Sequence, residues 1–176
     1  TPSWGYADTG TRFGKFLQDG AARTIDEKLA DAAQVHQFTG CCPTVAVHVL
    51  WDFTPDAQPA DIAARAKKLG VRIGAINPNV FQDQCYKYGS LANRDPEIRQ
   101  RALQHLLDSV AIGRAVQSSL LSLWFADGTN YHGQASIRAR KHWFHEGLRA
   151  VHDALPASMQ MLVEYNDAEV TEEKLK

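Results

Sequence analysis

Short apolar runs and longer segments of helical periodicity alternate along this 176-residue chain. The short runs are too brief for helices and predict strands. The longer segments place apolar side chains three and four residues apart, which is typical of helices with one buried face. The predicted strands are Thr44–Leu50, Val71–Ile76, Leu120–Phe125 and Met159–Tyr165, and the predicted helices span about residues 24–39, 59–69, 95–116 and 136–155.

Capping residues mark the ends of two of these helices. Thr24 and Glu27 have the spacing of a capping box, in which each side chain accepts a hydrogen bond from the other residue's backbone N–H. Gly40 follows the first helix, where a residue with positive φ commonly ends the helix. Pro59 stands where the second helix begins, and its missing N–H has no partner to lose there.

The order of the elements predicts an α/β fold. Strands that alternate with long helices form βαβ units, and such units build a parallel sheet. Neither a G-x-G-x-x-G nor a G-x-x-x-x-G-K-[ST] motif occurs, so the sequence carries no nucleotide-binding signature. A (β/α)8 barrel is the competing architecture, but four strands and a candidate fifth near Pro2–Tyr6 are too few to close one.

Composition and charge narrow the class of protein. The chain is 44% hydrophobic and 22% charged, with a net charge of −1, which is typical of a globular protein and argues against a nucleic-acid-binding surface. No apolar run is long enough to span a membrane, and the first residues lack the features of a signal peptide. Three cysteines, two of them adjacent, form no metal or redox motif, so we expect structural thiols in a reducing, cytoplasmic compartment.

Titratable residues at the carboxyl ends of the predicted strands are the first candidates for chemistry, because ligands bind at this edge of parallel sheets. His48 lies near the end of a buried strand, where an imidazole needs a partner, and a satisfied core histidine is the alternative. Glu164 closes the last strand, and metal ligation is the leading interpretation of a buried carboxylate there, although one carboxylate does not make a metal site. Asp52 also follows a strand, whereas Asp127 is expected to shape its Asp–Gly turn.

Aromatic residues lie near the same strand ends. Trp51 and Trp124 could wall a pocket, with core packing as the alternative for Trp124. The connection 77–93 is longer than usual, which is typical of functional loops. The aromatic-rich segment 1–20 is either an arm packed on the core or a binding loop.

Five motifs carry a resemblance to a known family. The stretches PSWGYADTGTRF, DAAQVHQFTG, INPNVFQDQCYKYGS, LWFADGTNYHGQ and the run ending LVEY resemble, in this order, the L-rhamnose isomerases of the bacterial broad-specificity type. These enzymes belong with the xylose-isomerase-like TIM barrels. The resemblance extends from Thr1 to about Tyr165, which indicates a partial sugar isomerase domain over residues 1–165 and a polar tail over residues 166–176.

The resemblance implies a (β/α)8 barrel, of which this chain holds about the first five βα units. It implies an enzyme that interconverts aldoses and ketoses between C1 and C2, such as L-rhamnose and L-rhamnulose, by a hydride shift or an enediol. It also implies a divalent metal, above all Mn²⁺, that polarises the substrate oxygens. By motif position, Glu164 matches a catalytic metal ligand, His48 matches a catalytic histidine that contacts the sugar, and Trp4, Phe13 and Trp124 match aromatic walls of the sugar pocket.

Two departures from the family leave alternatives open. Asn166 stands where the family has a lysine that reaches a substrate oxygen, and the family's other metal ligands come from strands six to eight. If the 176 residues are the whole protein, we expect little isomerase activity and a role as a sugar-binding or assembly module. A sugar epimerase of the same superfamily is a further alternative. A half-barrel has two open sheet edges, so we expect pairing with another chain, as in a homo-oligomer.

Overall fold

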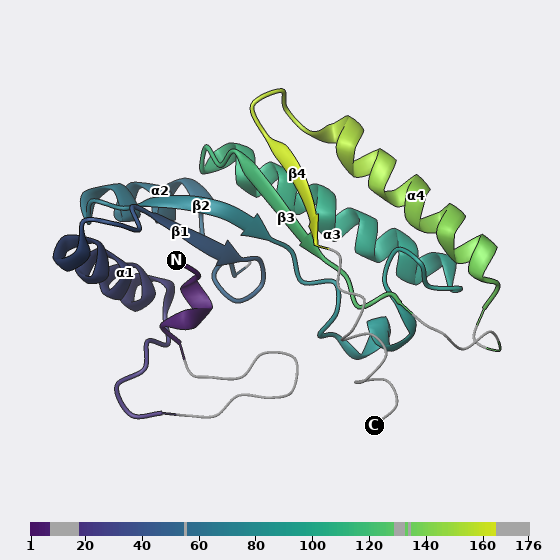
Figure 1. Cartoon of the computed structure of the whole chain (residues 1–176), viewed down its shortest axis with the longest axis horizontal. Coiled ribbons are helices and arrows are strands. Elements are labelled where there is room, and N and C mark those ends of the chain that lie inside the picture. The colour runs from purple at the N-terminus through teal and green to yellow at the C-terminus, as the bar shows by residue number, and fades with distance from the viewer. Residues whose placement is uncertain (8–17, 55, 129–132, 134, 165–176) are drawn as a thin grey trace.

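The computed structural model describes residues 1–7, 18–54, 56–128, 133 and 135–164. Four parallel strands form one sheet, in the order β1 (Thr44–His48), β2 (Arg72–Asn77), β3 (Leu120–Trp124) and β4 (Gln160–Glu164). The helix α1 (Ile25–Thr39) precedes β1, and α2 (Pro59–Lys68), α3 (Pro96–Ala115) and α4 (Ile137–Ala154) connect successive strands (Figure 1). The predicted α/β fold with a parallel sheet is confirmed.

Local capping signals set the helix ends. The Glu27 N–H donates to Thr24 Oγ1 over 3.2 Å, and Glu27 Oε2 accepts from the Thr24 N–H over 2.9 Å, which completes the predicted capping box. Gly40 ends α1 with a φ of 67°, and Pro59 is the first residue of α2. These predictions succeed because a cap depends only on residues close in the sequence.

Two predictions about strands are wrong. The segment near Pro2–Tyr6 is not a fifth strand: Pro2 forms an isolated bridge to Ala46 of β1, and a short 3₁₀ helix, η1 (Ser3–Gly5), follows. The first strand ends at His48, before the predicted Leu50, because Leu50 has a left-handed backbone with a φ of 82°. This turn redirects the chain so that residues beyond His48 fold back toward the strand end.

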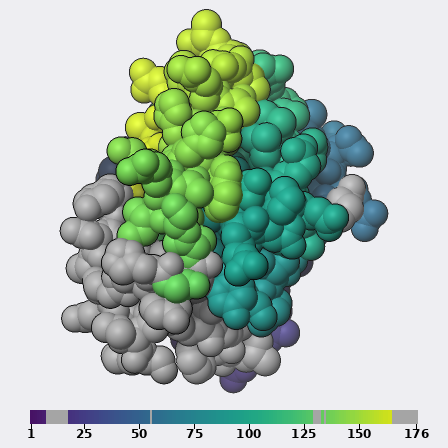
Figure 2. All heavy atoms as spheres, turned by 90° about the vertical axis from the view of Figure 1, so that its right-hand side faces the viewer, coloured from purple at the N-terminus to yellow at the C-terminus, as the bar shows by residue number. Residues whose placement is uncertain are grey.

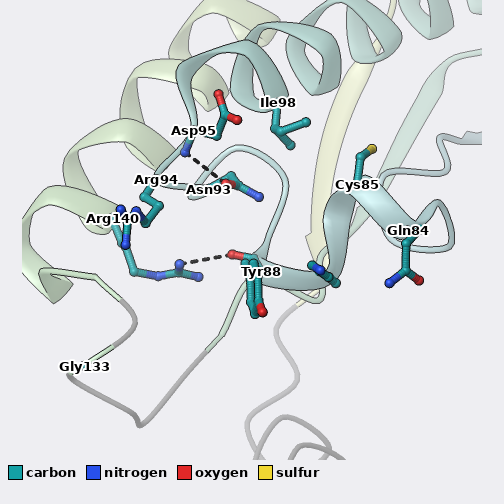
Figure 3. A pocket seen from close by; sticks show the side chains of 10 residues that line it. Gln84, Cys85, Tyr88, Asn93, Arg94, Asp95, Ile98, Gly133 and Arg140 are labelled. Atoms are coloured by element: carbon teal, nitrogen blue, oxygen red, sulfur yellow. Dashed lines mark hydrogen bonds between the residues drawn. The ribbon is translucent and has the colours of Figure 1, made fainter.

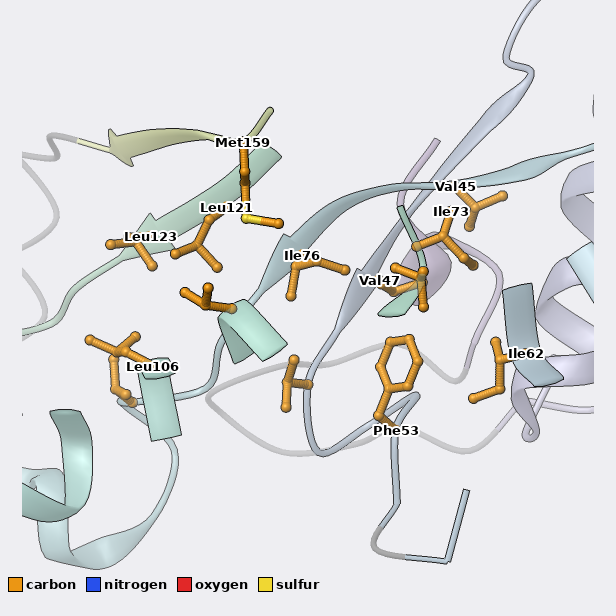
Figure 4. Packing of buried hydrophobic residues seen from close by; sticks show 14 of the residues in the cluster. Val45, Val47, Phe53, Ile62, Ile73, Ile76, Leu106, Leu121, Leu123 and Met159 are labelled. Atoms are coloured by element: carbon orange, nitrogen blue, oxygen red, sulfur yellow. The ribbon is translucent and has the colours of Figure 1, made fainter. Parts of the chain in front are cut away.

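The apolar core contains buried residues of the sheet and of the helices α1 to α4, and Figure 4 shows part of it. Val45 and Val47 of β1 are fully buried, as are Ile76 of β2 and Leu121 of β3. Ile62 of α2 is buried with them, on the helix stripe that the sequence predicts. Burying such side chains is the main favourable term in folding, at roughly 25 cal/mol per Å² of apolar surface.

The edge strand β4 differs from the other strands in burial. Leu162 is 49% exposed and Val163 is 44% exposed, whereas Leu121 and Leu123 of the neighbouring β3 are buried. The prediction of a buried last strand is therefore wrong for the described residues. The exposure of β4 follows from its position at the edge of the sheet, where β3 is the strand that pairs with it within the described residues.

The helices α3 and α4 lie side by side on one face of the molecule (Figure 2). The guanidinium of Arg99, on α3, sits 4.3 Å from the ring centre of Trp143, on α4, which joins the two helices through a cation–π contact. None of the helices in the described part of the chain is long and apolar enough to cross a membrane.

Candidate functional site

The carboxyl ends of the four strands meet at one pocket. The last residue of each strand lines it: His48 of β1, Asn77 of β2, Trp124 of β3 and Glu164 of β4. Parallel strands bring their carboxyl ends to the same edge of the sheet, so residues far apart in the sequence converge there. The pocket has a volume of about 190 Å³. The other residues that line it are Trp4, Trp51, Pro78, Phe81 and Ser122.

The pocket contains each predicted site residue that the structure describes. Trp4, His48, Trp124 and Glu164 line it together, although they lie on η1, β1, β3 and β4. Phe13 lies outside the described residues, as does Asn166. The predicted residues are thus brought together in space, whereas the role of each one stays a prediction.

Aromatic rings form one wall of this pocket. The imidazole of His48 stacks on Trp51, with ring centres 3.6 Å apart and planes 15° apart. Trp4 meets His48 edge-on at 5.8 Å, and Phe81 meets both His48 and Trp124 edge-on, at 5.8 and 4.8 Å. Edge-to-face contacts of this kind hold rings in fixed orientations. Trp124 therefore lies in the pocket wall with its ring held by Phe81.

His48 is buried and electrically neutral at pH 7. Burial is the main cause that lowers its pKa from the ordinary 6.5 to about 4, although the hydrogen bond to Val49 and the charge of Asp52 oppose this. Its Nδ1 lies 3.1 Å from the Val49 carbonyl oxygen, which can only accept, so Nδ1 carries the proton. The other ring nitrogen, Nε2, then has a free lone pair and can accept a hydrogen bond from a ligand hydroxyl.

A buried ion pair lies behind His48 and Trp4. Lys28 Nζ, on α1, donates to Asp52 Oδ1 over 2.7 Å, and the two side chains are 6% and 0% exposed. The Asp52 Oδ2 atom accepts from the His48 N–H over 2.7 Å and from the Ser3 hydroxyl. Because Ser3 precedes Trp4, one carboxylate fixes both the end of β1 and the turn that carries Trp4.

The same contacts show which residues sequence reasoning missed. Lys28 was not predicted as part of the site, although it shares a helix stripe with Ile25 and Ala32, where a lysine is unusual. Phe81 lies in the long connection 77–93, which the sequence marks as a functional loop without indicating which side chain reaches the pocket. No pattern in the sequence predicts that Ser3 contacts Asp52.

Glu164 lies at the pocket but is exposed, which corrects the expectation of a buried carboxylate. Its strand is at the edge of the sheet, so the predicted need for a compensating cation does not follow from burial. Within the described residues, no group of three or more His, Cys, Asp or Glu side chains could hold a metal ion. Mn²⁺ takes several oxygen or nitrogen ligands, so these residues do not complete a metal centre.

A second, larger cavity of about 710 Å³ lies between η2 (Gln84–Tyr88) and the start of α4 (Figure 3). Arg140 lines it and donates to the carbonyl oxygens of Tyr88, over 3.2 Å, and Asp127. Asp127 accepts from the backbone N–H groups of Ser90 and Ala92 over 2.8 and 2.7 Å. The Asp127 carboxylate therefore orders the 77–93 connection, whereas its predicted role in an Asp–Gly turn stays a prediction.

The sequence of this chain is similar to the sequences of probable sugar isomerases. No family model matches the chain. It is 34% identical over 169 residues to a probable sugar isomerase of Mesorhizobium japonicum and 35% identical over 169 residues to one of Rhizobium meliloti. Each alignment covers 93% of this chain and 39% of the relative, so the chain spans about two fifths of the length of these curated proteins.

Solved structures of sugar epimerases share the fold. An L-ribulose 3-epimerase matches 94% of this chain and 48% of its own, with a TM-score of 0.65 and 13% identity. A D-allulose 3-epimerase from Methylomonas sp. matches 94% of this chain and 50% of its own, with a TM-score of 0.62 and 11% identity. This chain therefore shares its fold with about half of each of these epimerase chains.

The chain is thus similar in sequence to probable sugar isomerases and shares its fold with sugar epimerases. None of the relatives named above is an L-rhamnose isomerase, so that narrower assignment stays a prediction.

Proposed function

We propose that this chain is the part of an aldose–ketose isomerase that holds the sugar, with L-rhamnose as the first substrate to test. The observation that carries the proposal is the meeting of His48, Asn77, Trp124 and Glu164 at one pocket, because each is the last residue of its strand. Similarity to probable sugar isomerases supports it. The motifs that resemble the bacterial L-rhamnose isomerases supply the choice of sugar.

The wall residues suit a sugar in shape and polarity. The aromatic faces of Trp4, Trp51 and Trp124 would pack against the C–H faces of the sugar. Neutral His48 would accept a hydrogen bond at Nε2 from a hydroxyl near C1, and Ser122 would bond a second hydroxyl. A histidine with a pKa of about 4 is a hydrogen-bond acceptor at pH 7, so its contribution to the reaction is to orient the sugar.

In this proposal Glu164 supplies one ligand to a divalent metal, Mn²⁺ being the first to test. Such a metal would supply polarisation of the sugar oxygens. The described residues offer Glu164 as a single carboxylate and do not complete the coordination shell. For this reason the chemical step is assigned to the longer protein, and the chain described here is assigned the binding of sugar.

The deciding experiment compares the 176-residue chain with a longer form of the protein that matches the length of its relatives. Each is incubated with L-rhamnose, with and without Mn²⁺, and the sugars are separated and identified. We expect L-rhamnulose from the longer form and sugar binding without turnover from the 176-residue chain. The longer form with Glu164→Gln should bind Mn²⁺ more weakly in calorimetry. Failure of the longer form to produce any ketose would overturn the proposal.

Epimerisation at C3 is the second candidate, favoured by the shared fold with L-ribulose 3-epimerase and D-allulose 3-epimerase. The same assay separates the two reactions, because isomerisation converts an aldose into a ketose whereas the second reaction converts one ketose into its C3 epimer. Incubation with a ketose, followed by identification of the product, therefore distinguishes them.

A further inference from the structure

The vicinal cysteines Cys41 and Cys42 lie at the end of the sheet opposite the sugar pocket. They occupy the turn between Gly40, which ends α1, and Thr44, which begins β1. Cys41 is exposed and Cys42 is half-buried, so a small reagent can approach the pair. Their Sγ atoms are 3.8 Å apart.

The backbone holds the two sulfur atoms together without favouring a disulfide. Consecutive Cα atoms across a trans peptide are about 3.8 Å apart, below the range of about 4.4–6.8 Å in ordinary disulfides. The peptide bond between Cys41 and Cys42 is trans, and Cys42 has a left-handed conformation with a φ of 69°. A disulfide would require the sulfurs to approach to about 2.05 Å, whereas an atom that bridges both of them needs no such approach.

The two thiols differ in how easily they ionise. Cys41 Sγ lies 3.1 Å from Thr39 Oγ1, and the interaction with the Thr39 hydroxyl is the main cause that lowers the pKa of Cys41. The interaction with Cys41 raises the pKa of Cys42. One thiol therefore ionises first and can attack, and its neighbour remains protonated nearby.

We propose that Cys41 and Cys42 form a chelating dithiol site for monosubstituted trivalent arsenicals. Two As–S bonds form as two As–O bonds of R–As(OH)₂ break, and the two hydroxyl groups leave as water with the two thiol protons. No electrons are transferred. The arsenic retains its carbon substituent as a third bond, so two sulfurs complete the site. A four-coordinate Zn²⁺ would need further ligands, and within the described residues no third His, Cys, Asp or Glu joins this pair.

The test is a titration of the unmodified protein with phenylarsine oxide, followed by mass spectrometry and thiol counting. We expect one phenylarsenic group per chain and the loss of two of the three free thiols. A small dithiol should reverse the modification, whereas a monothiol at the same concentration should not. A second phenylarsenic group, or reversal by the monothiol, would overturn the proposal.

Single serine substitutions assign the site. The variants Cys41→Ser and Cys42→Ser should bind phenylarsine oxide at least about 100-fold more weakly, because one thiol cannot chelate. The variant Cys85→Ser is the matched control and should bind like the parent protein. We expect all three variants to fold, because each change exchanges residues of similar size at a site that is not fully buried. Circular dichroism checks this. Equal binding by Cys41→Ser and the parent would contradict the assignment.

Discussion

Lys28 Nζ lies 2.7 Å from Asp52 Oδ1, and both side chains are almost fully shielded from water. This contact joins α1 to the segment after β1. The carboxylate also accepts hydrogen bonds from the Ser3 hydroxyl and the His48 N–H. It therefore links the segment that contains Trp4 to the end of β1, where the His48 imidazole faces the pocket. The ion pair thus supports the pocket from behind.

Removal of the lysine charge is expected to destabilise the fold. Lys28→Met leaves Asp52 buried with two donors and no cation, which should cost about 3–5 kcal/mol of unfolding free energy in urea denaturation. Arg65→Met is the matched control, because the pair of Arg65 with Asp26 is also short, at 2.6 Å, but its side chains are 43% and 60% exposed. That change should cost less than about 1 kcal/mol. Similar losses in both variants would show that burial does not matter here.

The buried His48 should make stability depend on pH. Its pKa is about 4 in the folded chain and 6.5 ordinarily, so the unfolded chain binds more protons between these values. Stability should therefore fall as the pH drops from 6.5 toward 4, by up to roughly 3 kcal/mol for this group. Above pH 6.5 both states are neutral at this residue, and its contribution is constant. Urea unfolding across this range measures the effect.

The control for this pH dependence is His48→Gln, which cannot gain a proton. Its stability curve should be flatter between pH 4 and 6.5 than that of the parent. NMR titration of the His48 ring should also give a pKa near 4. An ordinary value near 6.5 would refute the buried, neutral state.

Gly89 is expected to resist substitution. Its φ is 105°, and an added Cβ would lie 3.0 Å from Asp127 Oδ2, the atom that orders the neighbouring loop. Gly89→Ala should therefore lose roughly 2–3 kcal/mol of unfolding free energy. Gly70 also has a positive φ, of 84°, but an added Cβ meets nothing within 4 Å, so Gly70→Ala should cost only about 1 kcal/mol. Equal costs would mean that the contact with Asp127 is unimportant.

Trp124 is expected to contribute to sugar affinity. If it stacks on the sugar as proposed, Trp124→Ala should weaken L-rhamnose binding between roughly 2- and 12-fold in calorimetry. Trp143→Ala is the control, because Trp143 lies on α4 against Arg99 and does not line the pocket. An unchanged affinity in the Trp124 variant would exclude this ring from the binding site.

The sequence by itself determined the elements and their order. Capping residues such as Thr24 and Pro59 act through neighbours in the chain, and the periodicity of apolar residues reports which face each helix buries. The same reasoning placed His48, Trp124 and Glu164 at strand ends, because parallel strands end at one edge of the sheet. Motif resemblance added Trp4, which no periodicity indicated.

Only the tertiary structure decided which side chains are buried at that edge and which face each other. Glu164 is exposed because β4 lies at the edge of the sheet. The apolar residues that precede Glu164 predict a buried strand instead. Lys28 reaches Asp52 across 24 positions in the sequence, and Phe81 comes from the long connection to meet Trp124. Such contacts depend on how separate elements pack, and that packing carries no local pattern in the sequence.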